Sequence, residues 1–419
     1  MKKHTLVNTL LSLTGNPRAC IYTEPLWGIP FNLYTPYVSV YMVALGLADT
    51  QIGLIVSISW GFQVIFALLS GVITDKMGRR LTTLIFDILG WSVPALISAV
   101  AQNFWYFLAA AIINSIWRIT HNSWTCLLVE DAEKEQLVDI FTWIHIANQL
   151  VGLAAPLAGI IIGIYSLIPT MRGLYIFAAI MFAIKAIVTY LLTEETEQGK
   201  IRLEETRQQS VFDVLSEYKA VVRDILHMPQ TLYTAAIMVI ISISQIVTGS
   251  FWAIILTEKL HIPNQHLALF PFIRSAIILL FFFVVMPRIA KLHFKVPMII
   301  GFLGYVLSQV LLITAPELGY GFLIISSFLE ACSFAVVSPL VDQMVVLTID
   351  AKERARIQSI LYVGIILITS PFGWIAGQLS GINKDFPFIL NIVLFIIGAF
   401  LAYFAGQASQ KNSAKIEIA

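Results

Sequence analysis

Charged residues are scarce in this chain of 419 residues, because only 12% of its positions are Asp, Glu, Lys or Arg. A soluble domain averages about 25% charged residues. Hydrophobic residues make up 58% of the chain, and the mean hydropathy is +0.83. In water such a chain would expose far too much apolar surface, so we expect the lipid bilayer to be its solvent.

Several chemical signatures are also missing. The three cysteines, Cys20, Cys126 and Cys332, lie in or beside apolar stretches and suggest neither a disulfide framework nor a metal site. No glycine-rich loop ends in Gly-Lys-Ser/Thr, and no catalytic Ser-His-Asp or Cys-His arrangement is visible. We therefore expect no enzyme activity, no cofactor, no metal and no ATP-driven step in this chain. The net charge of +1 and the lack of a soluble domain argue against a nucleic-acid partner.

Long apolar runs fill most of the sequence. A helix that crosses the hydrocarbon core needs about 20 mostly apolar residues. Twelve stretches meet this requirement, and we expect each to be a transmembrane helix: 20–45, 51–73, 82–101, 104–128, 138–165, 172–193, 232–257, 266–286, 296–315, 319–347, 355–380 and 387–406.

The distribution of Lys and Arg orients these spans, because both residues concentrate in cytoplasmic loops. If both termini are cytoplasmic, twenty of the 26 basic residues fall in inner segments. The outer loops hold only Arg172, Lys259 and Lys384, and three more lie inside spans: Arg118, Lys185 and Arg274. This alternation supports the span count and predicts a multi-pass protein of the cell membrane.

A polar segment separates six spans from six. We expect an N-terminal bundle over 1–193, a cytoplasmic linker over 194–230, a C-terminal bundle over 231–406 and a cytoplasmic tail over 407–419. A weak repeat supports the division: Ala155-Pro156 in span five and Ser370-Pro371 in span eleven are breaks at corresponding places. Parallel six-helix repeats are a known transporter architecture.

The strongest motif, Gly71-Val-Ile-Thr-Asp75-Lys-Met-Gly78-Arg79-Arg80, lies between spans two and three. It resembles the loop motif of the major facilitator superfamily in composition, spacing and position. That resemblance implies twelve transmembrane helices in two pseudo-symmetric six-helix bundles, working by alternating access.

The resemblance also implies that Asp75 and Arg79 belong to a latch between the bundles, with Glu130 or Asp131 as acidic neighbours. Gly71 would allow close helix approach, and Gly78 would permit a tight turn. The alternative is a plain anchor of basic residues at the cytoplasmic interface. Such an anchor does not need Asp75.

Polar residues form helical stripes in spans one, four, seven and ten, and the spacing alone shows this. In the resembled family these helices line a central cavity. The alternative, helix packing, is preferred for the small residues. Together with a His and a Gln four residues apart in span five, the stripes give these candidate cavity residues: Asn32, Thr35, Asn114, Arg118, His121, His145, Gln149, Gln245 and Trp252. His145 is equally well explained as a neutral structural histidine.

Three further ionisable residues are candidates for proton coupling: Glu24, Arg274 and Glu330. Such groups are costly at bilayer depth and normally face a cavity or a partner. We expect Arg274 and Glu330 to pair. Asp87 and Lys185 look less promising, because spans three and six are peripheral in the resembled fold and a lysine can snorkel to the interface.

The sequence therefore predicts a monomeric secondary transporter for a small organic solute. The degenerate Ala155-Pro156 and Gly159 pattern in span five resembles that of antiporters, so we favour proton-coupled export. Uptake of a sugar or another nutrient and a membrane sensor without turnover remain the alternatives.

Overall fold

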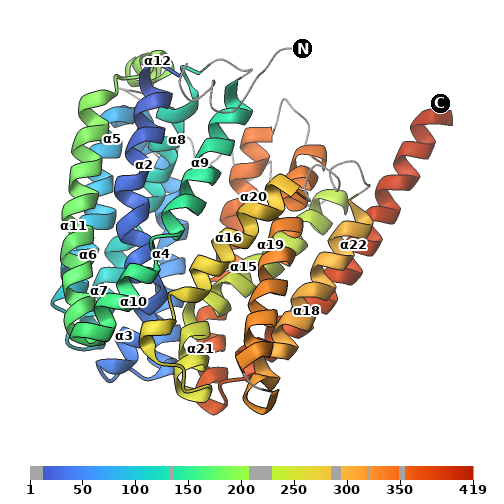
Figure 1. Ribbon diagram of the computed structural model, residues 1–419. Helices are drawn as coiled ribbons and strands as arrows, with labels where there is room; N and C mark the ends of the chain where they lie inside the picture. The colour runs from blue at the N-terminus through green and yellow to red at the C-terminus, as the bar shows by residue number, and fades with distance from the viewer. Residues whose placement is uncertain are drawn as a thin grey trace. The chain divides into compact units, whose positions relative to one another are not determined.

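The computed structural model describes residues 13–132, 136–206, 229–284, 294–318, 320–348 and 354–418. In these ranges the regular structure is helical throughout, and no strand occurs (Figure 1). The prediction of an all-α protein is confirmed. The linker residues 207–228, within the predicted 194–230, lie outside the described residues.

Contacts between residues divide the chain into two compact units. The first comprises Met1–Leu47, Ile58–Leu215 and Asn264–Phe272. The second comprises Ala48–Ser57, Ser216–Pro263 and Ile273–Ala419. Apart from the two short segments 48–57 and 264–272, the first unit holds predicted spans one to six and the second holds spans seven to twelve.

The elements up to the linker follow the predicted spans. They are α2 (Gly15–Tyr34), η1 (Thr35–Tyr37), α3 (Val38–Ala44), α4 (Asp49–Met77), α5 (Arg79–Asp87), η2 (Ile88–Ser92), α6 (Val93–Ala99), α7 (Phe104–Asn114), α8 (Trp117–Val129), α9 (Leu137–Gly152), α10 (Pro156–Tyr165), α11 (Leu167–Leu192) and α12 (Glu197–Glu205).

The elements after the linker follow the predicted spans in the same way. They are α15 (Pro229–Ile254), η5 (Ile255–Lys259), η6 (Asn264–His266), α16 (Leu269–Val284), α18 (Lys295–Leu318), α19 (Tyr320–Thr348), α20 (Arg354–Thr369), α21 (Phe372–Ile382) and α22 (Phe386–Ile418). The last helix runs on as far as Ile418, so the segment predicted as a tail continues span twelve.

Ten helices in the described part of the chain are long and apolar enough to cross a membrane. The other two predicted spans correspond to α2 with α3 and to α7 with α8, which are interrupted and carry polar residues. Glu24 lies in α2, and Arg118 lies in α8. These two spans, one and four, are among the four for which the sequence predicts polar stripes.

Proline sets the breaks in spans five and eleven, as predicted. Pro156 is the first residue of α10, and Pro371 immediately precedes α21. A proline lacks the N–H that an uninterrupted helix would use, and its ring clashes with the preceding turn. Each span is therefore divided into two helices at the place where the sequence changes to small residues and proline.

Aromatic side chains fill the interior of the first unit. Trp27 stacks on Phe31 within α2 at a centroid distance of 4.5 Å, and Trp91 of η2 meets Trp27 edge-on at 5.1 Å. Trp91 also lies 5.8 Å from Phe182 of α11. Offset and edge-to-face pairs of this kind stabilise packing beyond their buried area. They fix α2, η2 and α11 against one another.

The core of the second unit lies where α15, α18, α19 and α22 meet. Tyr305 stacks on Phe395 at 4.5 Å with nearly parallel rings. Small residues let α18 and α19 approach closely, because a Cβ added at Gly301 would lie 2.5 Å from Val337 Cγ2. In lipid, close packing of this kind replaces the hydrophobic effect as the force that holds helices together.

We expect Gly301→Ala to destabilise the second unit by about 1–3 kcal/mol, because the new methyl group overlaps a stiff valine side chain. The matched control is Gly364→Ala in α20, where no heavy atom lies within 4 Å of the added Cβ. Thermal unfolding of the purified protein should show a lower midpoint for the first variant and an unchanged or higher midpoint for the second. Equal midpoints would contradict the close contact between α18 and α19.

Candidate functional site

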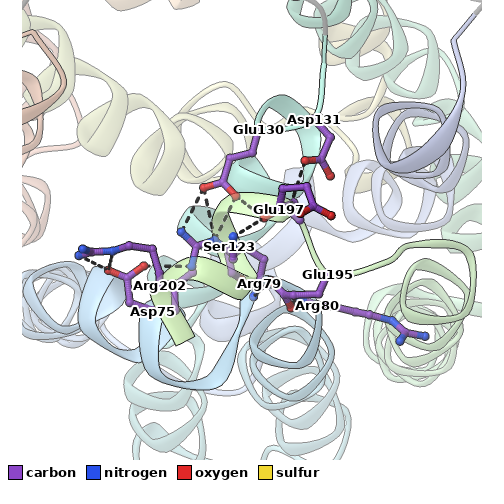
Figure 2. A network of polar contacts seen from close by, with 12 residues as sticks. Asp75, Arg79, Arg80, Ser123, Glu130, Asp131, Glu195, Glu197 and Arg202 are labelled. Atoms are coloured by element: carbon purple, nitrogen blue, oxygen red, sulfur yellow. Dashed lines mark hydrogen bonds and ion pairs between the residues drawn. The ribbon is translucent and has the colours of Figure 1, made fainter. Parts of the chain in front are cut away.

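A buried arginine organises the network of charges where α4 ends and α5 begins (Figure 2). The Arg79 side chain is 5% exposed. Its Nη1 lies 3.0 Å from Asp75 Oδ1, and its Nε lies 3.1 Å from Glu130 Oε2. A second nitrogen, Nη2, donates to Glu130 Oε1 at 3.1 Å. The predicted contact between Arg79 and Glu130 is thus confirmed, and it is the bidentate kind that an arginine favours.

The network also includes the first part of the linker, which sequence reasoning missed. Arg202 of α12 donates to Asp75 Oδ2 through Nε at 3.2 Å and through Nη2 at 2.9 Å. Thr196, the N-cap of α12, donates to Glu130 and accepts from the backbone N–H of Gly199. Figure 1 shows α12 at this end of the first unit. Asp75 and Glu130 therefore bind both Arg79 and the first part of the linker.

Hydrogen bonding keeps the linker arginine charged. The bond to Asp75 is the main reason that the pKa of Arg202 is raised above its ordinary value, and partial burial offsets only part of this. Arg202 is a permanent cation at any pH that the protein would meet. It therefore binds Asp75 Oδ2 as a cation while Arg79 binds Oδ1.

Glu195 explains the requirement for Gly78. Its two carboxylate oxygens accept from the backbone N–H groups of Arg79 and Arg80 at 2.8 and 3.1 Å. Gly78 has φ +82°, and a Cβ there would lie 2.6 Å from Glu195 Oε2. A carboxylate at the N-terminus of α5 is favoured by the helix dipole. The glycine thus gives both the turn and the room for this acid.

The other residues predicted for the latch have different partners. Arg80 donates to the carbonyl of Tyr190 at 2.9 Å and lies over its ring at 3.9 Å. Asp131 accepts from Asn16 at 3.1 Å. Around Gly71 there is open space within 4 Å of an added Cβ, so its expected role in close helix approach is not seen among the described residues.

Arg118 forms a second polar group in α8. Its Nε donates to Gln63 Oε1 of α4 at 2.9 Å. Its guanidinium lies 4.2 Å from the Trp117 ring centroid and 6.0 Å from that of Trp60. His121 meets Trp117 edge-on at 5.5 Å. Two residues that the sequence singled out, Arg118 and His121, are thus brought together around one indole, and Gln63 is a further member that was missed.

Three other candidates in the first unit satisfy backbone groups. Asn32 donates to the Gly28 carbonyl at 2.8 Å, Thr35 donates to the Phe31 carbonyl at 2.6 Å, and Asn114 donates to the Gly90 carbonyl at 2.7 Å. The bonds of Asn32 and Thr35 lie within one helix, and the bond of Asn114 joins α7 to η2. The oxygen of each side chain is still able to accept another bond.

The remaining cavity candidates lie on α9 and α15. His145 on α9 is exposed and Gln149 is half-buried. Gln245 on α15 is exposed and Trp252 is half-buried. Their role as substrate contacts stays a prediction.

The predicted pairing of Arg274 with Glu330 is confirmed within the second unit. Arg274 Nε lies 2.9 Å from Glu330 Oε2, with the two side chains 39% and 21% exposed. The guanidinium also lies 4.6 Å from the Phe334 ring centroid. The pair joins α16 to α19.

For Asp87 and Lys185, the expectation that the lysine snorkels to the interface is wrong. These residues form a buried ion pair, with Lys185 Nζ 2.6 Å from Asp87 Oδ2 and side chains 6% and 4% exposed. Lys185 does not snorkel because its partner lies inside the unit. The missed signal is the step of four from Arg79 through Thr83 to Asp87, which puts all three on one face of α5.

We expect Glu130→Gln to lower stability by about 1–3 kcal/mol, because Arg79 stays buried with a weaker partner. Glu197→Gln is the matched control, since Glu197 on α12 is 80% exposed and pairs only with Lys200 among the described residues. Thermal unfolding should separate the two variants. The same midpoint in both would show that the Arg79–Glu130 contact adds nothing.

Comparisons with known proteins agree with this architecture. The family model of the Major Facilitator Superfamily matches residues 27–292. Multidrug resistance protein MdtG of Serratia proteamaculans (strain 568) is 36% identical over 89 residues, 20% of this chain and 21% of that protein. MdtG of Proteus mirabilis (strain HI4320) is 26% identical over 206 residues, 47% and 49% of the two chains. The matches thus span from about a fifth to about half the length of these curated relatives.

Two solved structures have the same fold at low identity. Nucleoside transporter NupG aligns over 94% of this chain and 99% of its own, with a TM-score of 0.68 and 15% identity. A bacterial homolog of the human lysosomal transporter Spinster aligns over 98% and 99%, with a TM-score of 0.71 and 13% identity. Because the family model matches more than half of its length, the chain belongs to the Major Facilitator Superfamily of membrane transporters.

Proposed function

We propose that this transporter exports a small amphipathic organic solute in exchange for protons, by alternating access. It acts as a monomer in the cell membrane, with both termini in the cytoplasm. Relatives named as multidrug resistance proteins support export of organic compounds. The charge alternation along the spans supports the orientation.

The observation that carries the proposal is the surroundings of Arg118. An ionisable residue in a membrane span is functional by default, since burying it costs about 2.5–3.5 kcal/mol. Here the guanidinium lies between two indoles, Trp117 and Trp60, and bonds to the amide of Gln63. Flat aromatic faces next to hydrogen-bonding groups suit a solute with an apolar ring and a polar substituent.

Uptake of a sugar or nutrient is less well supported. That reading relied on amide side chains such as Asn32, whose N–H is already donated to the Gly28 carbonyl. Nucleoside and peptide transporters among the structural neighbours are below 25% identical and share the fold alone. The aromatic rings around Arg118 and the names of the relatives favour export.

We also propose that the Asp75–Arg79–Glu130 network is the family's conformational latch in a form that includes the linker. Arg202 and Thr196 bind the same two acids as Arg79. Movement of α12 away from α4 and α8 would free both carboxylates for other partners. The linker is therefore part of the latch in this proposal.

The sign of the proton gradient tests the direction of coupling. A stabilising compound is first selected by thermal shift of the purified protein and then used for counterflow in proteoliposomes. An antiporter moves solute against the proton flux, so we expect accumulation in vesicles that are acidic inside and none in vesicles that are acidic outside. Proton symport reverses this result, and a facilitator ignores the gradient. A sensor gives no counterflow.

Glu330→Gln should weaken the pH dependence of transport and slow it by about tenfold or more, a loss of roughly 1.4 kcal/mol of transition-state stabilisation. The reason is that Arg274 keeps a neutral partner of the same shape but loses the group that can change charge. Transport assays across pH in proteoliposomes measure the effect, with Glu197→Gln as the control. Unchanged pH-dependent transport would remove Glu330 from the mechanism.

A further inference from the structure

A second set of charges lies deep inside the first unit. Asp87 of α5 and Lys185 of α11 are in direct contact at 2.6 Å, and the two residues are 3% and 5% exposed. Each ion loses several kcal/mol of hydration at such a site, so an ion pair there persists only with good geometry and further hydrogen bonds. The surroundings of the pair supply both.

Both oxygens of the Asp87 carboxylate have donors. Oδ2 accepts from Lys185, and Oδ1 accepts from the Thr120 hydroxyl of α8 at 3.0 Å. The Lys185 ammonium also lies 5.7 Å from the Trp124 ring centroid. These contacts favour the charged forms of both residues, which together carry no net charge.

Glu24 adds a second carboxylate to this single ammonium. It lies on α2, which packs along α11, and is 9% exposed. The preceding residue, Thr23, has its hydroxyl 2.9 Å from that of Thr189, one turn after Lys185 on α11. Glu24 is thus held near the pair, and it interacts electrostatically with both Lys185 and Asp87. In the described part of the chain its carboxylate accepts no hydrogen bond. With all three groups ionised the cluster holds one surplus negative charge.

Among the residues that the structure describes, the groups that interact with Glu24 include no further ionised partner that offsets this charge. Cys20 on α2 is the remaining titratable group that interacts with Glu24, Asp87 and Lys185, and its neutral thiol is fully buried. Among the described side chains, α8 contributes the uncharged Thr120 and Trp124. The part of α9 that packs on α2 contributes Ile140, Trp143 and Ile144, and its His145 is exposed.

The backbone beside Asp87 is also unusual. The π-helical turn η2, Ile88–Ser92, starts immediately after it, and turns of this kind are frequent at functional sites. Asn114 holds the turn by donating to the Gly90 carbonyl at 2.7 Å. A Cβ at Gly90 would lie 3.0 Å from the backbone nitrogen of Trp117, so η2 packs directly against the start of α8.

We propose that Glu24, Asp87 and Lys185 form a buried site that binds one proton, taken up by the Glu24 carboxylate. Uptake turns the carboxylate into a neutral carboxylic acid and removes the surplus charge, while Asp87 and Lys185 stay paired. This site deepens the proposed function and rests on it for its role as the coupling site. Thr120 connects it to α8, the helix that carries Arg118.

Infrared spectroscopy of the purified protein tests the proton site without transport. On lowering the pH from about 8 to about 5, we expect the C=O stretching band of a buried protonated carboxyl group to appear. Glu24→Gln should abolish this band and reduce proton uptake by one per molecule, whereas Glu197→Gln should leave both unchanged. A band that survives Glu24→Gln would overturn the assignment.

Lys185→Met tests whether the three residues act together. Without the ammonium, the band should appear at higher pH. The two carboxylates then repel each other with no positive charge beside them, which favours the protonated form. An unmoved band would overturn the shared site. If Glu24→Gln does not give folded protein, Glu24→Asp takes its place, and a shifted band is expected.

Transport assays on the same variants separate this site from the proposed function. If Glu24→Gln changes neither proton-driven transport nor the infrared band, the proposed proton site is wrong and the proposed transport function stands. If the band follows the expected pattern but the protein shows no proton-driven transport, the proton site stands and the proposed function is wrong.

Discussion

Polar contacts between α5 and α8 hold the first unit together in a solvent that offers no hydrogen bonds. Arg79, Thr83 and Asp87 follow one another at steps of four along α5. Their partners on or just beyond α8 are Glu130 at 3.1 Å, Ser123 at 2.8 Å and Thr120 at 3.0 Å. Inside a bilayer an unpaired polar group costs several kcal/mol, so each pair both stabilises the contact and fixes its register.

One helix therefore connects three chemically different places. The end of α8 leads to the charges that hold α12, Thr120 in its first turn binds Asp87, and Arg118 at its start lies beside Trp117. A shift of α8 along α5 by one turn would break all three hydrogen-bonding contacts at once. Rigid helices with discrete contacts of this kind are suited to two-state changes rather than gradual ones.

Patterns along the sequence were enough to predict the helices but not all of their partners. Hydropathy and Lys/Arg alternation predicted the spans, and Pro156 and Pro371 fixed the breaks in spans five and eleven. Arg79 with Glu130 and Arg274 with Glu330 were found because a motif or a shared depth pointed to them. The motif and the proline breaks can be read from the sequence of a single helix, and the shared depth can be read from the position of a residue within its span.

The remaining contacts depend on how helices are rotated against one another. Lys185 was expected to snorkel because its span is peripheral, yet it faces inward to Asp87. Arg202 and Glu195 lie in a polar linker, where nothing in the local pattern marks a partner. The spacing of Arg79, Thr83 and Asp87 could have shown that α5 has a polar face. The spacing does not show which helix packs against that face.

The two membrane-embedded ion pairs differ in how completely their own unit encloses them, and this difference suits them to different tasks. Asp87 and Lys185 have side chains 4% and 6% exposed, while Glu330 and Arg274 have side chains 21% and 39% exposed. Breaking the enclosed pair in the first unit leaves an unsolvated charge and costs about 3–5 kcal/mol. The pair in the second unit is less enclosed by its own unit, so in the proposed mechanism it is the pair that can open to a solute. The pair in the first unit stays closed, so the balance of charge there changes most easily at the neighbouring Glu24, by gain or loss of a proton.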